Sequence, residues 1–192
     1  MKRGYTLVEL LVAASASIIL ITLATGIYVN VNLQVGRGEE EMILAQNGRA
    51  VIDRISRDVR QAVNLATVIP FERVDAVDSL EFEDGHNISA DGPTYIEYQL
   101  ENVQNGIGEI TRSRHFYYFE GNEGVRLPYN SGTEGQSGFN KEIITVDSYT
   151  IADDVQSLEF YGTDNLIKID VTLQHKANGQ TLDLHSAVAK RN

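Results

Sequence analysis

The feature that most constrains this chain is an uncharged run near its N-terminus. The 27 residues from Leu10 to Gly36 contain no charged side chain, and one carboxylate, Glu9, stands immediately before them. As a helix with a rise of about 1.5 Å per residue, this run is about 40 Å long, which exceeds the roughly 30 Å of a bilayer's hydrocarbon. We therefore expect residues 5–36 to form a membrane-spanning helix.

The charges on either side of the run predict its orientation. Lys2 and Arg3 precede it, whereas Glu39, Glu40 and Glu41 follow it closely. Because basic residues favour the cytoplasmic side of a span, the N-terminus is expected in the cytoplasm. The remainder of the chain is then expected outside the cytoplasmic membrane, in the periplasm or at the cell surface.

Two simple interpretations of the run leave something unexplained. A secretory signal cleaved after Ala14-Ser15-Ala16 fits poorly, because the apolar residues continue well past Ala16. A plain single-span anchor accounts for the length but not for Glu9. A carboxylate inside an apolar run costs about 2.5–3.5 kcal/mol at the bilayer centre and less toward the interface, so it usually marks a function.

The residues around Glu9 form a recognisable motif. Gly4 follows two basic residues and precedes Tyr5-Thr6-Leu7-Val8-Glu9, which resembles the class III signal of type IV pilins and pseudopilins. In that family a prepilin peptidase cuts after the glycine and methylates the new N-terminal amine. The resemblance implies that residues 1–4 are a cleaved leader, that Tyr5 is the methylated first residue, and that Glu9 serves in assembly. The family more often has phenylalanine where this chain has Tyr5, and the aromatic character is kept.

Pairing between subunits would explain the carboxylate of Glu9. Cleavage after Gly4 creates an ammonium group at Tyr5, and a buried ammonium and a buried carboxylate offset much of each other's desolvation cost. We therefore expect Glu9 of one subunit to meet the N-terminus of the next. The alternative is that Glu9 only reaches the cytoplasmic interface of the membrane.

A second, amphipathic half of the helix is expected over residues 37–69. We expect a break at Gly36-Arg37-Gly38, and Pro70 should end the helix because proline disfavours the helical state before it. Arg54 and Asp58 are spaced four residues apart, as ion pairs on a helix are, and a charged row lies on the outer face. The expected apolar face consists of Ile52, Ile55, Val59, Ala62 and Val63. The expected charged row consists of Arg49, Asp53 and Arg57.

Residues 70–192 change to the two-residue alternation of strands, which predicts an antiparallel sheet with one face covered by the amphipathic helix. Residues 121–140 are rich in glycine and predict a long loop. The predicted fold class is therefore α+β. The expected strands are Ser79–Glu83, Thr94–Leu100, Gly108–Arg112, His115–Phe119, Ile143–Val146, Val155–Tyr161, Ile167–Leu173 and Thr181–Ala189.

Sequence motifs in the sheet region and in the helix make the resemblance to this family more specific. The segments SLEF, YIEYQL and VQSLEFYG, with the helix motif GRAVIDRISRDVRQAV, are similar to PilW-like minor pilins and to the minor pseudopilin J of type II secretion. That resemblance implies a pilin-like fold and a non-enzymatic subunit that primes or caps a type IV pilus or secretion pseudopilus. Its partners would be the prepilin peptidase, the membrane and other pilins or pseudopilins. The alternative function is a tip adhesin or ligand-binding module that uses residues 121–140.

Other chemistry has weak support in the sequence. The formal charge of −11 disfavours direct nucleic-acid binding, and the chain has no cysteine and no nucleotide-binding or hydrolase motif. We expect no catalytic residue, cofactor or resident metal, although turn carboxylates could hold calcium. A turn at Asn178-Gly179 would place Val171 opposite His185. Further candidate site residues are His86, His115, His175, Asp75, Asp78, Glu83, Asp84, Asp153, Asp154, Tyr117, Tyr118 and Phe119.

Overall fold

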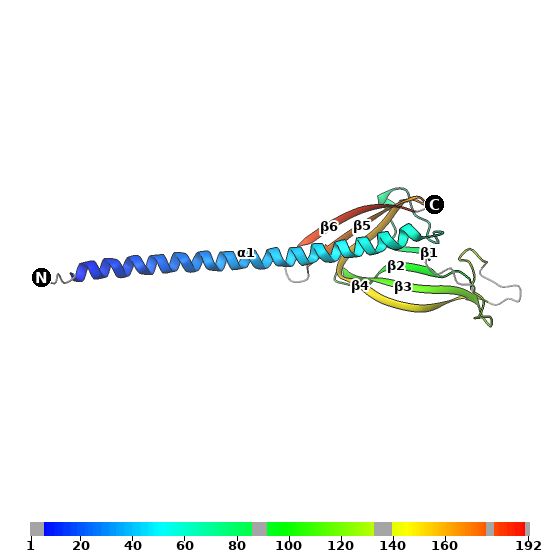
Figure 1. Ribbon diagram of the computed structural model, residues 1–192, viewed down its shortest axis with the longest axis horizontal. Coiled ribbons are helices and arrows are strands. Elements are labelled where there is room, and N and C mark those ends of the chain that lie inside the picture. Colours follow the sequence, from blue (N-terminus) through cyan, green and yellow to red (C-terminus); the bar gives the residue numbers. More distant parts are fainter. Residues whose placement is uncertain (1–5, 86–91, 133–139, 176–178, 191–192) are drawn as a thin grey trace. The chain divides into compact units, whose positions relative to one another are not determined.

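One long helix precedes six antiparallel strands in a computed structural model that describes residues 6–85, 92–132, 140–175 and 179–190 (Figure 1). The α+β class expected from the sequence is confirmed. The chain divides into two units, residues 1–43 and 44–192, and each is described by itself. The elements are α1 (Leu7–Gln61), the short 3₁₀ helix η1 (Arg73–Asp75), β1 (Ser79–Glu83), β2 (Tyr95–Gln104), β3 (Ile107–Phe119), β4 (Lys141–Thr163), β5 (Leu166–Gln174) and β6 (Thr181–Ala189).

The strands form one sheet in which each strand pairs with the next along the chain. The outer edge of β1 is covered by the residues that follow α1. Leu65 forms a bridge with Phe82, and the Val63 amide donates to the Glu83 carbonyl at 3.1 Å. This cover matters because a bare sheet edge invites pairing with other chains.

Strands β3 and β4 are each longer than the sequence predicted. Each contains two segments that the sequence pattern predicted as separate strands. The cause is the irregular register between β3 and β4. Arg114 pairs with Asp147 but His115 pairs with Thr145, so Val146 is an extra residue in β4. Such bulges shift side chains to the opposite face and interrupt the period-two pattern, although the strand itself continues.

Helix α1 differs from the expectation at two points. It runs through Gly36 and Gly38 without a break, because a glycine inside a helix costs only about 1 kcal/mol relative to alanine. It ends at Gln61 and not at Pro70. The earlier end is explained by the next residues, whose backbone groups pair with β1 and therefore leave the helix.

The apolar face of the C-terminal part of α1 packs on the sheet. Val51, Ile55 and Val59 are buried in one core with strand residues, and Ile52 packs partly against it. Val63, expected on this face, is 44% exposed because it lies beyond the helix end. The strand residues of the core are Leu80, Phe82, Ile96, Tyr98, Ile110, Ala152, Val155, Leu158, Phe160, Ile167, Ile169, Val171, Leu173 and Val188.

A buried ionic group also joins α1 to the sheet. Asp58 accepts hydrogen bonds from the Tyr98 hydroxyl at 2.7 Å and from Nε of Arg112 at 2.9 Å. Burial is the largest single effect and disfavours the charged form of Arg112, but the hydrogen bonds and charges of Asp58 and Tyr98 together outweigh it and raise the pKa of Arg112 above its ordinary value. Arg54, the partner expected from the helix spacing, lies farther from Asp58, at 3.9 Å. The main partner of Asp58 is therefore a strand residue, and this ion pair fixes the helix on the sheet.

Candidate functional site: an apolar helix surface with a carboxylate in its first turn

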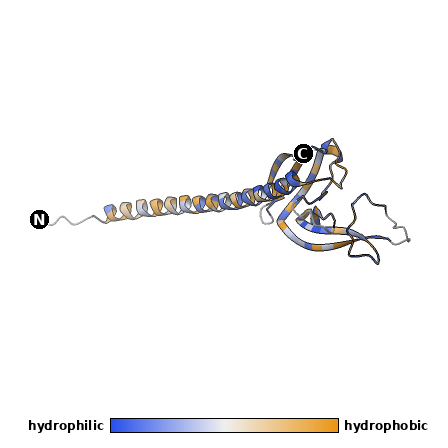
Figure 2. Cartoon of the chain, turned by 45° about the vertical axis from the view of Figure 1, so that its right-hand side comes forward, coloured by the Kyte–Doolittle hydropathy of each residue, from blue (hydrophilic) through white to orange (hydrophobic). Residues whose placement is uncertain are grey.

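The first part of α1 exposes apolar side chains all around its axis. Between Leu7 and Val35 the large apolar residues are about half exposed or more, and Leu20 and Ile21 are each 66% exposed. Figure 2 shows hydrophobic and neutral colours along this part of the helix and more hydrophilic ones toward its C-terminal end. The helix is long and apolar enough to cross a membrane, and it lies near the N-terminus.

Several hydroxyl and amide side chains in this segment bond to their own helix. Ser17, for example, donates to the Ala13 carbonyl at 2.8 Å. Satisfied in this way, these polar groups need no water, which lowers the cost of placing them in hydrocarbon. The same pattern holds for Ser15 with Val12, Thr22 with Ile18, Thr25 with Ile21, and Asn30 with Gly26.

Glu9 closes a capping box at the start of α1. Its Oε2 accepts from the Thr6 backbone N–H at 2.8 Å and from the Thr6 hydroxyl at 3.0 Å. In return, the Glu9 N–H donates to the Thr6 hydroxyl at 3.3 Å. A threonine and a glutamate three residues apart are the sequence signature of this motif, which was not among the features predicted from the sequence.

The capping box leaves the carboxylate with spare capacity. Both bonds from Thr6 reach the same oxygen, and an ionised carboxylate has about four acceptor sites in all. Glu9 can therefore cap its own helix and still accept a bond from a cation of another chain. Gly4 and Tyr5, the expected cleavage and methylation residues, lie outside the described residues.

The structure places carboxylates beside His115 and His185. Nε2 of His115 lies 2.9 Å from Glu81, and Nδ1 of His185 lies 2.9 Å from Asp170. The expected register at His185 was wrong, because Asp170 and not Val171 lies opposite it in the β5–β6 ladder. His86 lies outside the described residues. Across the part of the chain that the structure describes, no group of three or more His, Asp or Glu residues is arranged to hold a metal ion.

The acidic candidates for a calcium site lie at η1, next to β1 and within β4. Asp75 ends η1, Asp78 immediately precedes β1, and Asp84 is buried just after that strand. Asp153 and Asp154 lie in β4 and border a hollow of about 340 Å³ beside Leu44 and Asn47 of α1.

The aromatic residues of β3 are engaged in contacts with neighbouring segments. The Tyr117 hydroxyl donates to Glu81 at 2.5 Å, and the ammonium of Lys141 lies 4.2 Å from the Tyr117 ring centre. The described part of the 121–140 loop folds back here, since Leu127 bridges Tyr117 and the Tyr129 amide donates to the hydroxyl of buried Tyr95 at 2.8 Å. This part of the loop therefore packs against Tyr95 and Tyr117.

Glu97 on β2 provides a test of the electrostatics in the region of Glu81 and His115. Burial raises the pKa of Glu97 above its ordinary value, and the charges of Glu81 and Glu101 raise it further. The charge of His115 and a hydrogen bond with Ser113 act in the opposite direction. A carboxyl whose pKa is raised by folding lowers stability at a pH above both values, and this effect disappears as the pH falls below them. We expect Glu97→Gln to raise the melting temperature at pH 7 and to leave it nearly unchanged near pH 3.5.

Differential scanning calorimetry at the two pH values measures this difference. Glu109→Gln, a change of the same kind on β3, serves as the control and should have a smaller effect. An equal gain for Glu97→Gln at both pH values would contradict the electrostatic explanation.

In comparisons with known proteins, no family model, no curated protein and no solved structure matches this chain.

Proposed function

We propose that this chain is a non-enzymatic minor subunit of a type IV filament, either a pilus or the pseudopilus of type II secretion. The observation that carries the proposal is the first part of α1. Its apolar surface has no cover from the described residues of its own unit, 6–43, and one carboxylate, Glu9, lies in the first turn. The motif from Gly4 to Glu9 resembles the signal of that family.

The mechanism begins with the helix surface, which needs an apolar environment. The bilayer supplies it before assembly, and the helices of neighbouring subunits supply it within the filament. Apolar burial alone does not distinguish these two environments, because lipid tails are as apolar as leucine side chains. Polar groups must therefore determine the position of a subunit along the filament, and Glu9 is the charged group of this segment.

Glu9 acts by pairing with a neighbour's N-terminus. Cleavage after Gly4 places an ammonium group on Tyr5, and the carboxylate of Glu9 has capacity for a second donor beyond Thr6. A displaced subunit would leave both charges unpaired in an apolar environment, at a cost of several kcal/mol. The paired arrangement is therefore the most stable position of the subunit along the filament.

The first test is the mass of the mature chain. Intact mass spectrometry of protein purified from the producing cell should show a chain that lacks residues 1–4 and has one added methyl group on Tyr5. A chain that begins at Met1, or after Ala16, has no ammonium at Tyr5 and contradicts the proposal.

The second test separates the charge of Glu9 from its capping role. We expect Glu9→Gln, which still accepts from the Thr6 N–H, to insert into the membrane normally and to enter filaments at least about tenfold less. Loss of one buried charge pair exceeds the 1.4 kcal/mol that corresponds to tenfold. Quantitative immunoblots of sheared filaments against membranes measure both quantities.

Thr6→Ala is the matched control, because it removes the cap hydroxyl and keeps the carboxylate. It should lower incorporation much less than Glu9→Gln. Equal losses in the two variants would assign Glu9 to capping alone, and normal incorporation of Glu9→Gln would exclude the pairing.

A further inference from the structure

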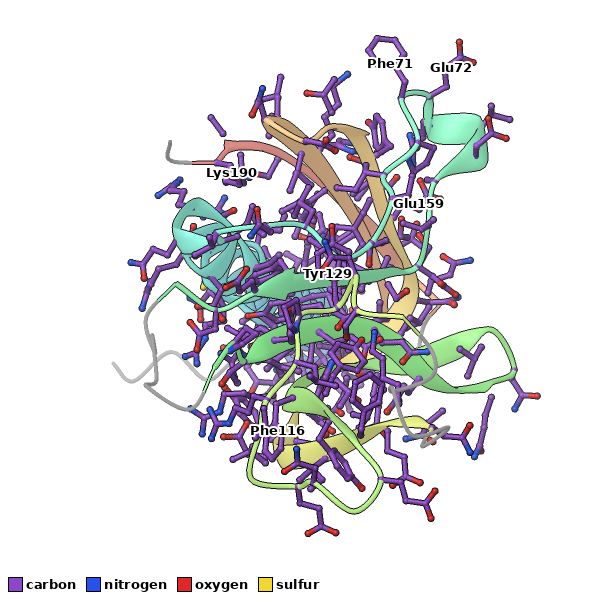
Figure 3. All side chains as sticks on the ribbon, turned by 90° about the vertical axis from the view of Figure 1, so that its right-hand side faces the viewer. Phe71, Glu72, Phe116, Tyr129, Glu159 and Lys190 are labelled. Carbon is purple, nitrogen blue, oxygen red and sulfur yellow. The ribbon has the colours of Figure 1, made fainter. Side chains whose placement is uncertain are left out.

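The connector between α1 and β1 exposes three large apolar side chains within seven residues. Val68 is 88% exposed, Phe71 75% and Val74 84%. Figure 3 shows Phe71 and its neighbour Glu72 projecting from this connector away from the rest of the unit. Single exposed apolar residues are ordinary, whereas three within seven residues, one of them aromatic, make this segment a candidate contact site.

The connector is held in place on both sides of these residues. Before them, the Thr67 hydroxyl accepts from the Glu81 amide at 2.8 Å. Between them, the Pro70 carbonyl accepts from the Gly162 amide at 2.8 Å, and after them Val77 bridges Phe160. The exposed side chains therefore project from a fixed backbone, so little backbone entropy is lost when they bind.

The charges around the three residues are mainly negative. Arg73 is occupied by an ion pair with Glu159 at 2.8 Å and with buried Asp170 at 3.1 Å. Its hydrogen bond to Glu159, with the charges of both carboxylates, raises the pKa of Arg73 above the ordinary value. Glu72, Asp75 and Asp78 are exposed beside it. The apolar group is therefore bordered by carboxylates.

We propose that Val68, Phe71 and Val74 form a docking knob for a different protein, one that presents an apolar pocket bordered by lysine or arginine. A second copy of this chain would bring the same carboxylates to the contact and be repelled. An anionic membrane surface would be repelled for the same reason. The knob does not depend on the proposed function, although a neighbouring filament subunit is one protein that could supply such a pocket.

The test is a photo-crosslink from the knob in the full chain, in the cells that produce it. Phe71 is replaced by p-benzoylphenylalanine, and Val103, 54% exposed on β2, is replaced in a parallel chain as the control. We expect a discrete adduct from position 71 alone. Mass spectrometry should place it in an apolar site of another protein, next to lysine or arginine.

A charge placed in the knob should remove the adduct. Val74→Asp should lower its yield at least about tenfold, as expected for a residue at the centre of a contact, whereas Val103→Asp should not. Both side chains are largely exposed, so the melting temperature should change by no more than about 1 °C. The proposal is overturned by an adduct to lipid, to a second copy or to a site without basic residues. It is also overturned by no adduct above the control, or by a yield that Val74→Asp leaves unchanged.

Discussion

Replacing Arg112 by methionine should lower the free energy of unfolding of the sheet unit by about 3–5 kcal/mol. Arg112 and Asp58 are both nearly buried, and the substitution leaves the Asp58 carboxylate without its main cationic partner. An unpaired buried charge is far more costly than a missing apolar contact. Urea unfolding of the full chain in detergent, followed by tyrosine fluorescence, measures the loss.

Two further variants identify the cause of that loss. Arg114→Met breaks a pair with Asp147 whose side chains are 31% and 39% exposed, and it should cost less than about 1 kcal/mol. Adding Asp58→Asn to Arg112→Met should restore at least half of the lost stability, because the amide still accepts from Tyr98 and carries no charge. A double variant as unstable as Arg112→Met would show that lost packing is the cause.

Gly162→Ala should be the second strongly destabilising change, at about 3 kcal/mol or more. Gly162 has φ of +126°, a conformation that a side chain strains, and an added Cβ would lie 2.3 Å from the Leu166 carbonyl oxygen. That oxygen belongs to the backbone of the adjacent strand, so it cannot move aside without disturbing the β4–β5 ladder. The same unfolding measurement applies.

Gly106→Ala is the matched control for this prediction. Gly106 also has positive φ, at +80°, but an added Cβ there meets nothing within 4 Å. It should therefore show only the cost of the backbone conformation, about 1 kcal/mol. Equal losses at the two glycines would contradict the steric part of the argument.

Much of the fold could be predicted because one face of each element is apolar. The alternation in Ser79–Glu83 and Thr181–Ala189 predicted β1 and β6 with the observed bounds. The central part of β4 could not be predicted, because its bulges shift side chains between faces. The end of α1 was also predicted wrongly. It depends on backbone pairing with β1, and local helix propensity carries no information about that pairing.

The candidate site was predictable where its chemistry is local. The length of the apolar run and the position of Glu9 can be read from the sequence, and so can the spacing of Thr6 and Glu9 that is the signature of the capping box. The partner of Asp58 was not predictable, because Arg112 is 54 residues away and is brought near by the register of β2 and β3. The exposure of Phe71 likewise depends on how the connector is held.

The long strand β4 has a consequence for how the sheet folds. Its first half pairs with β3 and its second half with β5, so one strand belongs to both parts of the sheet. Neither part can complete its ladders before β4 arrives, and its pairing with β3 and β5 joins their stability into a single transition. The sheet should therefore fold in one cooperative transition, and a chain truncated before residue 141 should be degraded and not persist as a half-formed sheet.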